Sequence, residues 1–390
     1  MDYSFSNKIS ELKPSIIREI LKATSGKSVI PFSAGNPAPE TFPVEAIRRF
    51  TQSILEENPV AALQYGITEG YDPLRELLKR RLRDRFGSGR DFDDLFVVSG
   101  AQQGLELACK VFCNEGDAIV CESPSFIGAL NSFRSLGARL LGVPMENDGL
   151  DVAALEHTLA TEKNIKLIYL IPSFQNPTGI TTSLEKRRAI YALAKQYGVM
   201  ILEDNPYGDL RFRGEHIPTI KSMDEEGLVI YCGSFSKILS AGLRVGFVLA
   251  PSPVMEKMVV AKQGEDVHSV MLSQLLAYKF MGEYDFDGHI GLIREVYRRK
   301  CKLMTDSMDR FLDKSITYTC PDGGLFLWCS LPAHMDMLDY CKRAAGKGVA
   351  VVPGTAFLVQ EGEPCNAIRL NYSTPSDEQI VKGVEILGSL

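Results

Sequence analysis

Short apolar runs alternate with amphipathic segments through the middle of the chain. Each run is rich in Val, Ile, Leu and aromatic residues, which is typical of a strand buried on both faces of a sheet. The segments between the runs carry the spacing of helices, as do residues 43–57 and 72–86. Strands that alternate with helices in this way predict an α/β fold with a mostly parallel sheet. We expect its strands at 95–98, 118–122, 167–171, 199–204, 228–232 and 245–250.

The two ends of the chain have other patterns. Residues 8–24 place apolar side chains on one face of a predicted helix, and the Gly- and Pro-rich residues 33–39 predict an irregular loop that can approach a ligand. Residues 253–300 predict long helices, whereas 315–390 mix strands and helices. We therefore expect an N-terminal helix and loop at 1–48 that packs with the small domain, a large α/β domain at 49–290, and a small α+β domain at 291–390.

Composition narrows the function classes. The 390 residues exceed a usual single core, and the net charge of −6 at pH 7 argues against a nucleic-acid surface, which is expected to be basic. The N-terminal residues lack the pattern of a signal peptide, and no apolar run approaches membrane-spanning length. The nine cysteines and five histidines show no zinc-ligand spacing, and scattered cysteines are typical of reduced thiols. We expect a cytoplasmic protein that binds no metal, nucleic acid or membrane.

The most informative stretch follows the strand predicted at 228–232. Ser234 and Ser236 lie just before Lys237, and Arg244 follows seven residues later. Hydroxyl groups and an arginine can hold a phosphate, while the lysine amine is left free for covalent chemistry if its pKa is lowered. A solvated turn at the end of a strand is an equally good explanation of this motif alone.

Polar residues also follow the other predicted strands, and parallel strands present their carboxyl ends at one edge. Gly100 to Gln102 open a helix, whose N-terminus favours a phosphate. Asp204 can pair with a pyridinium nitrogen, Asn176 and Tyr207 can donate to a ring oxygen, and Phe126 can stack on a ring. Each residue also has an ordinary explanation as a turn, cap or core residue. Together they predict a site for a phosphorylated aromatic aldehyde.

With these motifs in this order, the chain resembles the class I and II aminotransferases of fold type I, which use pyridoxal 5′-phosphate. It is most similar to the 2-aminoadipate aminotransferase group, which includes LysN and enzymes like kynurenine aminotransferase II. The resemblance implies a mostly parallel seven-stranded sheet flanked by helices, with a smaller α+β domain. The matching stretches cover nearly the whole chain: 33–40, 63–66, 69–71, 99–104, 171–179, 203–207, 233–244 and 368–372.

The resemblance also implies residue roles. Lys237 would bond to the cofactor aldehyde and move the substrate proton, with Asp204 and Tyr207 as the other catalytic residues. Arg369 would bind the substrate α-carboxylate, and Tyr65 would reach the phosphate of a neighbouring subunit, which implies a homodimer with shared sites. Relatives often carry Ser at position 101 and Tyr at position 126. The remaining residues implied to contact cofactor or substrate are Gly35, Gly100, Ala101, Gln102, Phe126, Asn176, Ser234, Ser236 and Arg244.

The implied reaction is a ping-pong exchange of an amino group between an L-amino acid and a 2-oxo acid, with 2-oxoglutarate as the expected acceptor. The implied donors are 2-aminoadipate, glutamate, and aromatic or branched aliphatic amino acids. Arg18 would bind a distal carboxylate, or it is an exposed helix arginine. Two alternatives stay open: another pyridoxal-phosphate reaction on this fold, such as a β-lyase or decarboxylase, and a non-catalytic effector domain of a regulator, which the acidic charge disfavours.

Overall fold

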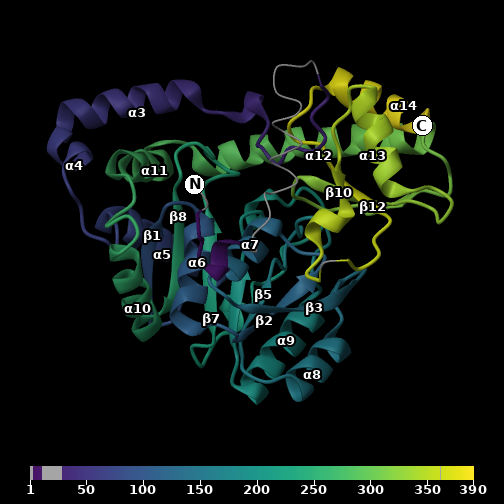
Figure 1. Cartoon of the computed structure of the whole chain (residues 1–390). Coiled ribbons are helices and arrows are strands. Elements are labelled where there is room, and N and C mark those ends of the chain that lie inside the picture. The colour runs from purple at the N-terminus through teal and green to yellow at the C-terminus, as the bar shows by residue number, and fades with distance from the viewer. Residues whose placement is uncertain (1–2, 11–28, 361) are drawn as a thin grey trace.

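A central eight-stranded sheet organises the protein in a computed structural model, which describes residues 3–10, 29–360 and 362–390 (Figure 1). Its strand order is β1-β8-β7-β6-β5-β2-β3-β4. The strands are β1 (Asp93–Val98), β2 (Ala118–Ser123), β3 (Arg139–Glu146), β4 (Gly149–Leu150), β5 (Ile165–Leu170), β6 (Met200–Asp204), β7 (Val229–Ser234) and β8 (Gly246–Pro251).

The prediction of a mostly parallel sheet is confirmed. Strands β3, β2, β5, β6 and β7 are paired in parallel, while β8 is antiparallel to both of its neighbours and β4 is antiparallel to β3. The predicted count of seven is one too low because β4 is a two-residue strand at the edge. Strand β3 was absent from the expected runs because its side chains alternate between buried and exposed instead of forming a continuous apolar stretch.

Helices cover both faces of the sheet. Alternate strand residues point to opposite faces, and because both sets are apolar, both faces need to be covered. In β2, Ile119 and Cys121 pack in the core that includes Leu105 of α6 (Ala101–Phe112), together with α7 (Ile127–Ser135). Val120 instead packs with Leu155 of α8 (Val152–Thr161) and with α9 (Leu184–Tyr197). The sheet is therefore apolar on both sides, and its polar groups are confined to the strand ends.

A second sheet lies in the C-terminal part, with the order β11-β12-β10-β9 and antiparallel pairing throughout (Figure 1). The long helix α12 (Phe286–Phe311) packs against α14 (Asp377–Gly388) of this part. The predicted limit between residues 290 and 291 falls inside α12, and the domain limits stay predictions. The other elements of this part are β9 (Thr317–Tyr318), β10 (Phe326–Ser330), α13 (Met337–Gly346), β11 (Val352–Pro353), η4 (Gly354–Phe357) and β12 (Ala367–Asn371).

The helices predicted at 43–57 and 72–86 are confirmed as α3 and α5, whereas most of the helix predicted at 8–24 lies outside the described residues. No helix of the described ranges is long and apolar enough to cross a membrane. The remaining elements are α1 (Asn7–Ser10), η1 (Pro39–Thr41), α3 (Val44–Glu57), α4 (Pro59–Leu63), α5 (Asp72–Phe86), η2 (Gly208–Leu210), η3 (Lys221–Met223), α10 (Ser252–Gln263) and α11 (Met271–Glu283).

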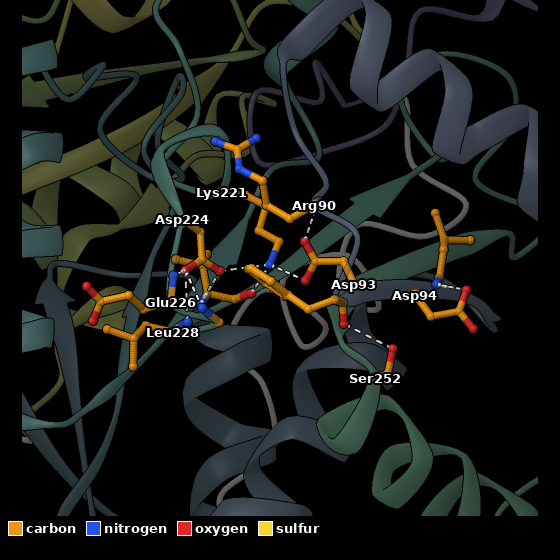
Figure 2. A network of polar contacts seen from close by, with 12 residues as sticks. Arg90, Asp93, Asp94, Lys221, Asp224, Glu226, Leu228 and Ser252 are labelled. Atoms are coloured by element: carbon orange, nitrogen blue, oxygen red, sulfur yellow. Dashed lines mark hydrogen bonds and ion pairs between the residues drawn. The ribbon is translucent and has the colours of Figure 1, made fainter.

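A buried ionic network ties the amino ends of β1 and β7 together (Figure 2). The Lys221 Nζ donates to Asp93 at 2.7 Å, to Asp224 at 2.9 Å and to the Val229 carbonyl at 2.9 Å. Asp224 in turn accepts from backbone N–H groups of the loop at 226–229. All of these charges are paired, which is the condition under which a lysine can stay buried. The network lies at the edge opposite the strand ends that carry the candidate site.

Candidate active site

The carboxyl ends of neighbouring strands bring the predicted residues together. Residues 99–102 follow β1, Phe126 follows β2, Asn176 follows β5, Asp204 ends β6, and residues 234–237 end β7 and continue into the next loop. Five segments far apart in the sequence therefore converge at one edge, where ligands bind in sheets of this kind.

The amine of Lys237 lies near positive and negative charges that have opposite effects on its pKa. Its side chain is partly buried, and the Nζ donates to the Gly35 carbonyl at 2.7 Å. Burial, and then the positive charges of Arg369 and Arg244, lower the pKa of Lys237 to about 8, while Asp204 opposes them. A substantial neutral fraction near pH 8 lets this amine act as a nucleophile or a base.

Asp204 is a buried carboxylate with one oxygen left over. Its Oδ2 accepts a hydrogen bond of 3.0 Å from the Tyr169 hydroxyl, and its Oδ1 has no partner within the described part of the chain. Burial raises the pKa of Asp204 to about 7, against the lowering effects of Tyr169 and Lys237. An unpaired buried carboxylate oxygen is costly, so Oδ1 is an obvious acceptor for a cationic N–H group of a ligand.

Arg369 is buried and held by hydrogen bonds and by aromatic rings. Its Nη1 donates to Asn176 Oδ1 at 3.0 Å and its Nη2 to the Ser33 carbonyl at 2.7 Å, while the guanidinium lies 4.3 Å from the centre of the Phe326 ring. Burial lowers the pKa of Arg369 to about 10, so it stays charged at neutral pH. The Nε has no partner among the described residues and remains available to a carboxylate. Asn176 also forms a hydrogen bond with the Tyr207 hydroxyl, so both predicted donors for a ring oxygen lie together.

The predicted phosphate-binding residues surround the N-terminus of α6. The Arg244 Nη2 donates to the Ser99 carbonyl at 3.1 Å, and its Nη1 lies 3.5 Å from Ser236 Oγ. A Cβ at Gly100, whose φ is +83°, would be strained and would lie 2.1 Å from this Nη2, so a larger residue would displace the arginine. Ser234 Oγ accepts from the Ser236 N–H at 3.1 Å. The first N–H groups of α6 have no intrahelical acceptor, which suits an anion.

Two of the predicted phosphate-binding residues, Gln102 and Ala101, can donate to a ligand only through their main-chain N–H groups. The Gln102 side-chain amide donates to the Gly128 carbonyl at 2.9 Å and to Ser132 Oγ at 2.8 Å, which joins α6 to α7. Its main-chain N–H is therefore the group left for a ligand. Ala101 likewise can offer only its main-chain N–H, since it has no side-chain donor.

Two predicted residues lie differently from the rest, and a third is outside the described residues. Phe126 is partly buried at the start of α7, beside the phosphate-binding residues. Tyr65 is 80% exposed, and its ring contacts His268 edge-on at 5.7 Å between centroids. Its role in a neighbouring subunit stays a prediction. Arg18 lies outside the described residues.

Three residues that support the site were missed from the sequence. Tyr169 looks like an ordinary core residue of an apolar strand, and nothing local indicates that its hydroxyl reaches Asp204. Glu122 is a charged residue in an apolar run, and this signal was available. Its Oε2 accepts from the Ile171 N–H at 3.0 Å and from Gln175 Nε2 at 3.2 Å. Glu122 and Gln175 therefore join the end of β2 to the loop that carries Asn176.

Pyridoxal 5′-phosphate presents the groups that this site can hold. Its phosphate suits the N-terminus of α6 and Arg244, its ring nitrogen suits the unpaired Asp204 Oδ1, and its ring oxygen suits Asn176 and Tyr207. Its aldehyde suits the amine of Lys237. The described residues therefore fit the cofactor.

Comparisons with known proteins show the family to which the chain belongs. The family described as aminotransferase class I and II matches residues 27–387. The chain is 40% identical to aromatic-amino-acid aminotransferase 1 of Thermococcus litoralis, over 99% of this chain and 94% of that protein. The structure of Pyrococcus horikoshii kynurenine aminotransferase, in complex with PMP, superposes with a TM-score of 0.95 at 36% identity and covers 99% and 96% of the two chains.

A third similar protein is LysN, the alpha-aminoadipate aminotransferase of Thermus thermophilus, complexed with N-(5′-phosphopyridoxyl)-L-leucine. It superposes with a TM-score of 0.91 at 39% identity, over 99% of this chain and 96% of that chain. Two of the similar structures thus carry derivatives of the cofactor that the site residues fit.

Proposed function

Because the chain belongs to the class I and II aminotransferases, which bind pyridoxal 5′-phosphate on fold type I, we propose that it transfers the amino group of an L-amino acid to 2-oxoglutarate by a ping-pong mechanism. The proposed donors are 2-aminoadipate, glutamate, and aromatic or branched aliphatic amino acids. The similarity to proteins named for aromatic amino acids, kynurenine and aminoadipate supports the aromatic and acidic donors.

One observation carries the proposal. The amine of Lys237, with a pKa of about 8, is within electrostatic reach of the buried Arg369, the proposed carboxylate-binding residue, and of the buried Asp204. Burial and the charges of Arg369 and Arg244 lower the pKa of this amine, so part of it is neutral near pH 8. An amine that has to take up and release a proton needs a pKa close to the working pH.

The residues have distinct proposed tasks. Arg369, through the Nε that has no partner among the described residues, would bind the α-carboxylate of the amino acid and so orient the Cα toward Lys237. The neutral Lys237 Nζ would take the proton from Cα and return it on the cofactor side. Asp204 Oδ1 would hold a proton at the ring nitrogen, and Asn176 would donate to the ring oxygen. When bound, the cofactor supplies the electron sink that makes the Cα proton acidic.

We also propose a homodimer with shared active sites. Tyr65 is exposed beside other apolar side chains that stand free at the surface, including Val60 and Leu63 at 73% each and Val270 at 60%. Exposed apolar side chains gathered in this way mark a surface that another protein covers. A second copy of the chain would bury them and bring Tyr65 to the phosphate of its partner. The cytoplasmic location, and the lack of nucleic-acid and membrane partners, stay predictions.

A half-reaction assay tests the function. The holoenzyme is mixed with one amino donor at a time, and the 2-oxo acid, the aminated cofactor, ammonia and CO₂ are measured. We expect the 2-oxo acid and the aminated cofactor in equal amounts, whereas ammonia or CO₂ would indicate a β-lyase or a decarboxylase. Lys237→Ala should lose both turnover and the covalent link to the cofactor, detected by mass after borohydride reduction. Full activity in that variant would overturn the assignment.

A further inference from the structure

A hollow of about 260 Å³ lies between α5, α12 and the loop that follows η2. Four basic side chains line it, namely Arg85 of α5, Arg211 and His216 of the loop, and Arg294 of α12, and we call this hollow the basic pocket. Its other lining residues are Phe86 and two glycines, so no carboxylate of the described residues lines it. The pocket is separate from the candidate active site, because none of its lining residues is a predicted site residue.

Two arginines of the basic pocket have N–H groups that are not used in strong contacts within the described residues. Arg294 uses its Nε to bond the Asp209 carbonyl at 2.6 Å, and neither of its Nη atoms has a partner in the described part of the chain. The Arg211 Nη1 donates to the Arg213 carbonyl at 3.1 Å, while the closest carboxylate, Asp322, is 3.8 Å away and half exposed. Each guanidinium therefore offers N–H groups that could bind an anion.

The carboxylates around the pocket are largely committed elsewhere. Asp209 and Asp287 both pair with Arg81 at 3.2 Å and also lie against Arg85. Asp322 is shared with Arg213 at 3.6 Å. Among residues 29–360 and 362–390, no carboxylate forms an ion pair with Arg294 or His216, and Arg211 has only Asp322, at 3.8 Å and shared with Arg213. The hollow therefore carries an excess of positive charge.

This excess of positive charge destabilises the folded protein. The Arg211 side chain is only 13% exposed, and burial lowers the pKa of both Arg211 and Arg294. The pKa of His216 is also lowered, first by burial and then by the charges of Arg187, Arg211 and Arg85. Cations that are partly desolvated with a weak counter-ion or none destabilise a fold, and an anion between them reduces that cost.

We propose that the basic pocket binds a small oxyanion with at least two negative charges, a phosphate or a dicarboxylate. Planar guanidinium groups bind both kinds of anion through paired N–H groups. The bound anion would be connected to the active site through Arg211, because its guanidinium lies 4.9 Å from the centre of the Phe174 ring. Phe174 lies in the same loop as Asn176, and η2 directly follows Tyr207. This inference does not depend on the identity of the amino donor.

Calorimetry on the holoenzyme tests the proposal. With the cofactor site saturated, inorganic phosphate and malonate are titrated separately, at ionic strength held constant with chloride. We expect saturable binding of one anion per chain for at least one of the two. Arg294→Gln and Arg211→Gln should each weaken that binding by about tenfold or more, since each removes charge-assisted hydrogen bonds. The better of the two anions identifies the ligand chemistry.

The controls separate this pocket from the active site. Arg298→Gln changes an exposed arginine of the same helix that pairs with Glu295, and it should leave anion binding unchanged. His216→Gln replaces one neutral side chain by another near neutral pH, because the pKa of His216 is lowered, and it should change anion binding much less than the two arginine variants. Absence of saturable binding, or equal binding by wild type and by the Arg294 and Arg211 variants, would overturn the proposal. So would a loss of binding in Arg298→Gln as large as in Arg294→Gln.

Discussion

Replacing Tyr169 with phenylalanine removes a single oxygen atom from the buried side of Asp204. The ring would stay in place, because it is fully buried and packs edge-on against Phe133 at 5.3 Å between centroids. The hydroxyl is the donor that the structure places on Asp204 Oδ2, at 3.0 Å. The variant therefore leaves both carboxylate oxygens of Asp204 without a partner from the described residues.

The size of the effect follows from the charge on the acceptor. A hydrogen bond to a charged group contributes about 1.5–3 kcal/mol. The Tyr169 hydroxyl lowers the pKa of Asp204, so its loss raises that pKa further and makes the ionised carboxylate more costly. In the proposed site, a protonated ring nitrogen of the cofactor would pair with the ionised form. We therefore expect the affinity for pyridoxal 5′-phosphate to fall by about 2 kcal/mol, which is roughly thirtyfold.

The assay is titration of the apoenzyme with the cofactor, followed by absorbance, together with the ¹⁵N chemical shift of a labelled ring nitrogen. The shift should move toward the unprotonated form in Tyr169→Phe. Tyr340→Phe is the matched control, because Tyr340 is a buried tyrosine whose hydroxyl donates to the Leu387 carbonyl at 2.9 Å, in the C-terminal part. If Tyr169→Phe bound the cofactor as tightly as Tyr340→Phe and showed the same ¹⁵N shift, the role of Tyr169 would be refuted.

Three further changes test other parts of the site. Burial raises the pKa of Glu122 from 4.5 to about 7, so the folded state binds this proton more tightly than the unfolded chain does. This tighter binding stabilises the fold below pH 4.5, and the stabilisation is lost as the pH rises through 7. Glu122→Gln should remove this loss, up to about 3 kcal/mol, and an unchanged fall of Tm between pH 5 and 8 would contradict it. Gly100→Ala should weaken cofactor binding about tenfold by displacing Arg244, whereas Gly116→Ala, with φ +86° and open space around it, should not; the readout is cofactor titration. Arg18→Ala should weaken glutamate and 2-aminoadipate more than leucine or phenylalanine in kcat/KM, and an equal effect on all four would discard its proposed contact with a distal carboxylate.

The sequence by itself determined the sheet and the kinds of chemical group at its edge. A run such as Val229 to Cys232 has few alternatives to a strand buried on both faces, and each polar motif follows its strand in the chain. Local sequence can specify these features because they depend on residues a few positions apart. The half-exposed β3 was harder to predict, because its alternating pattern becomes meaningful only once a neighbouring strand covers one face.

Only the tertiary structure decided which of these groups meet. Whether the Tyr169 hydroxyl reaches Asp204 depends on the register of two neighbouring strands, and whether Arg369 meets Asn176 depends on how the second sheet packs on the first. The basic pocket likewise joins Arg85 to Arg294 across more than half of the chain. Such contacts depend on long-range packing, which no local pattern of residues encodes. For this reason, the unpaired oxygen of Asp204 and the spare donors of Arg294 could be found only in the folded protein.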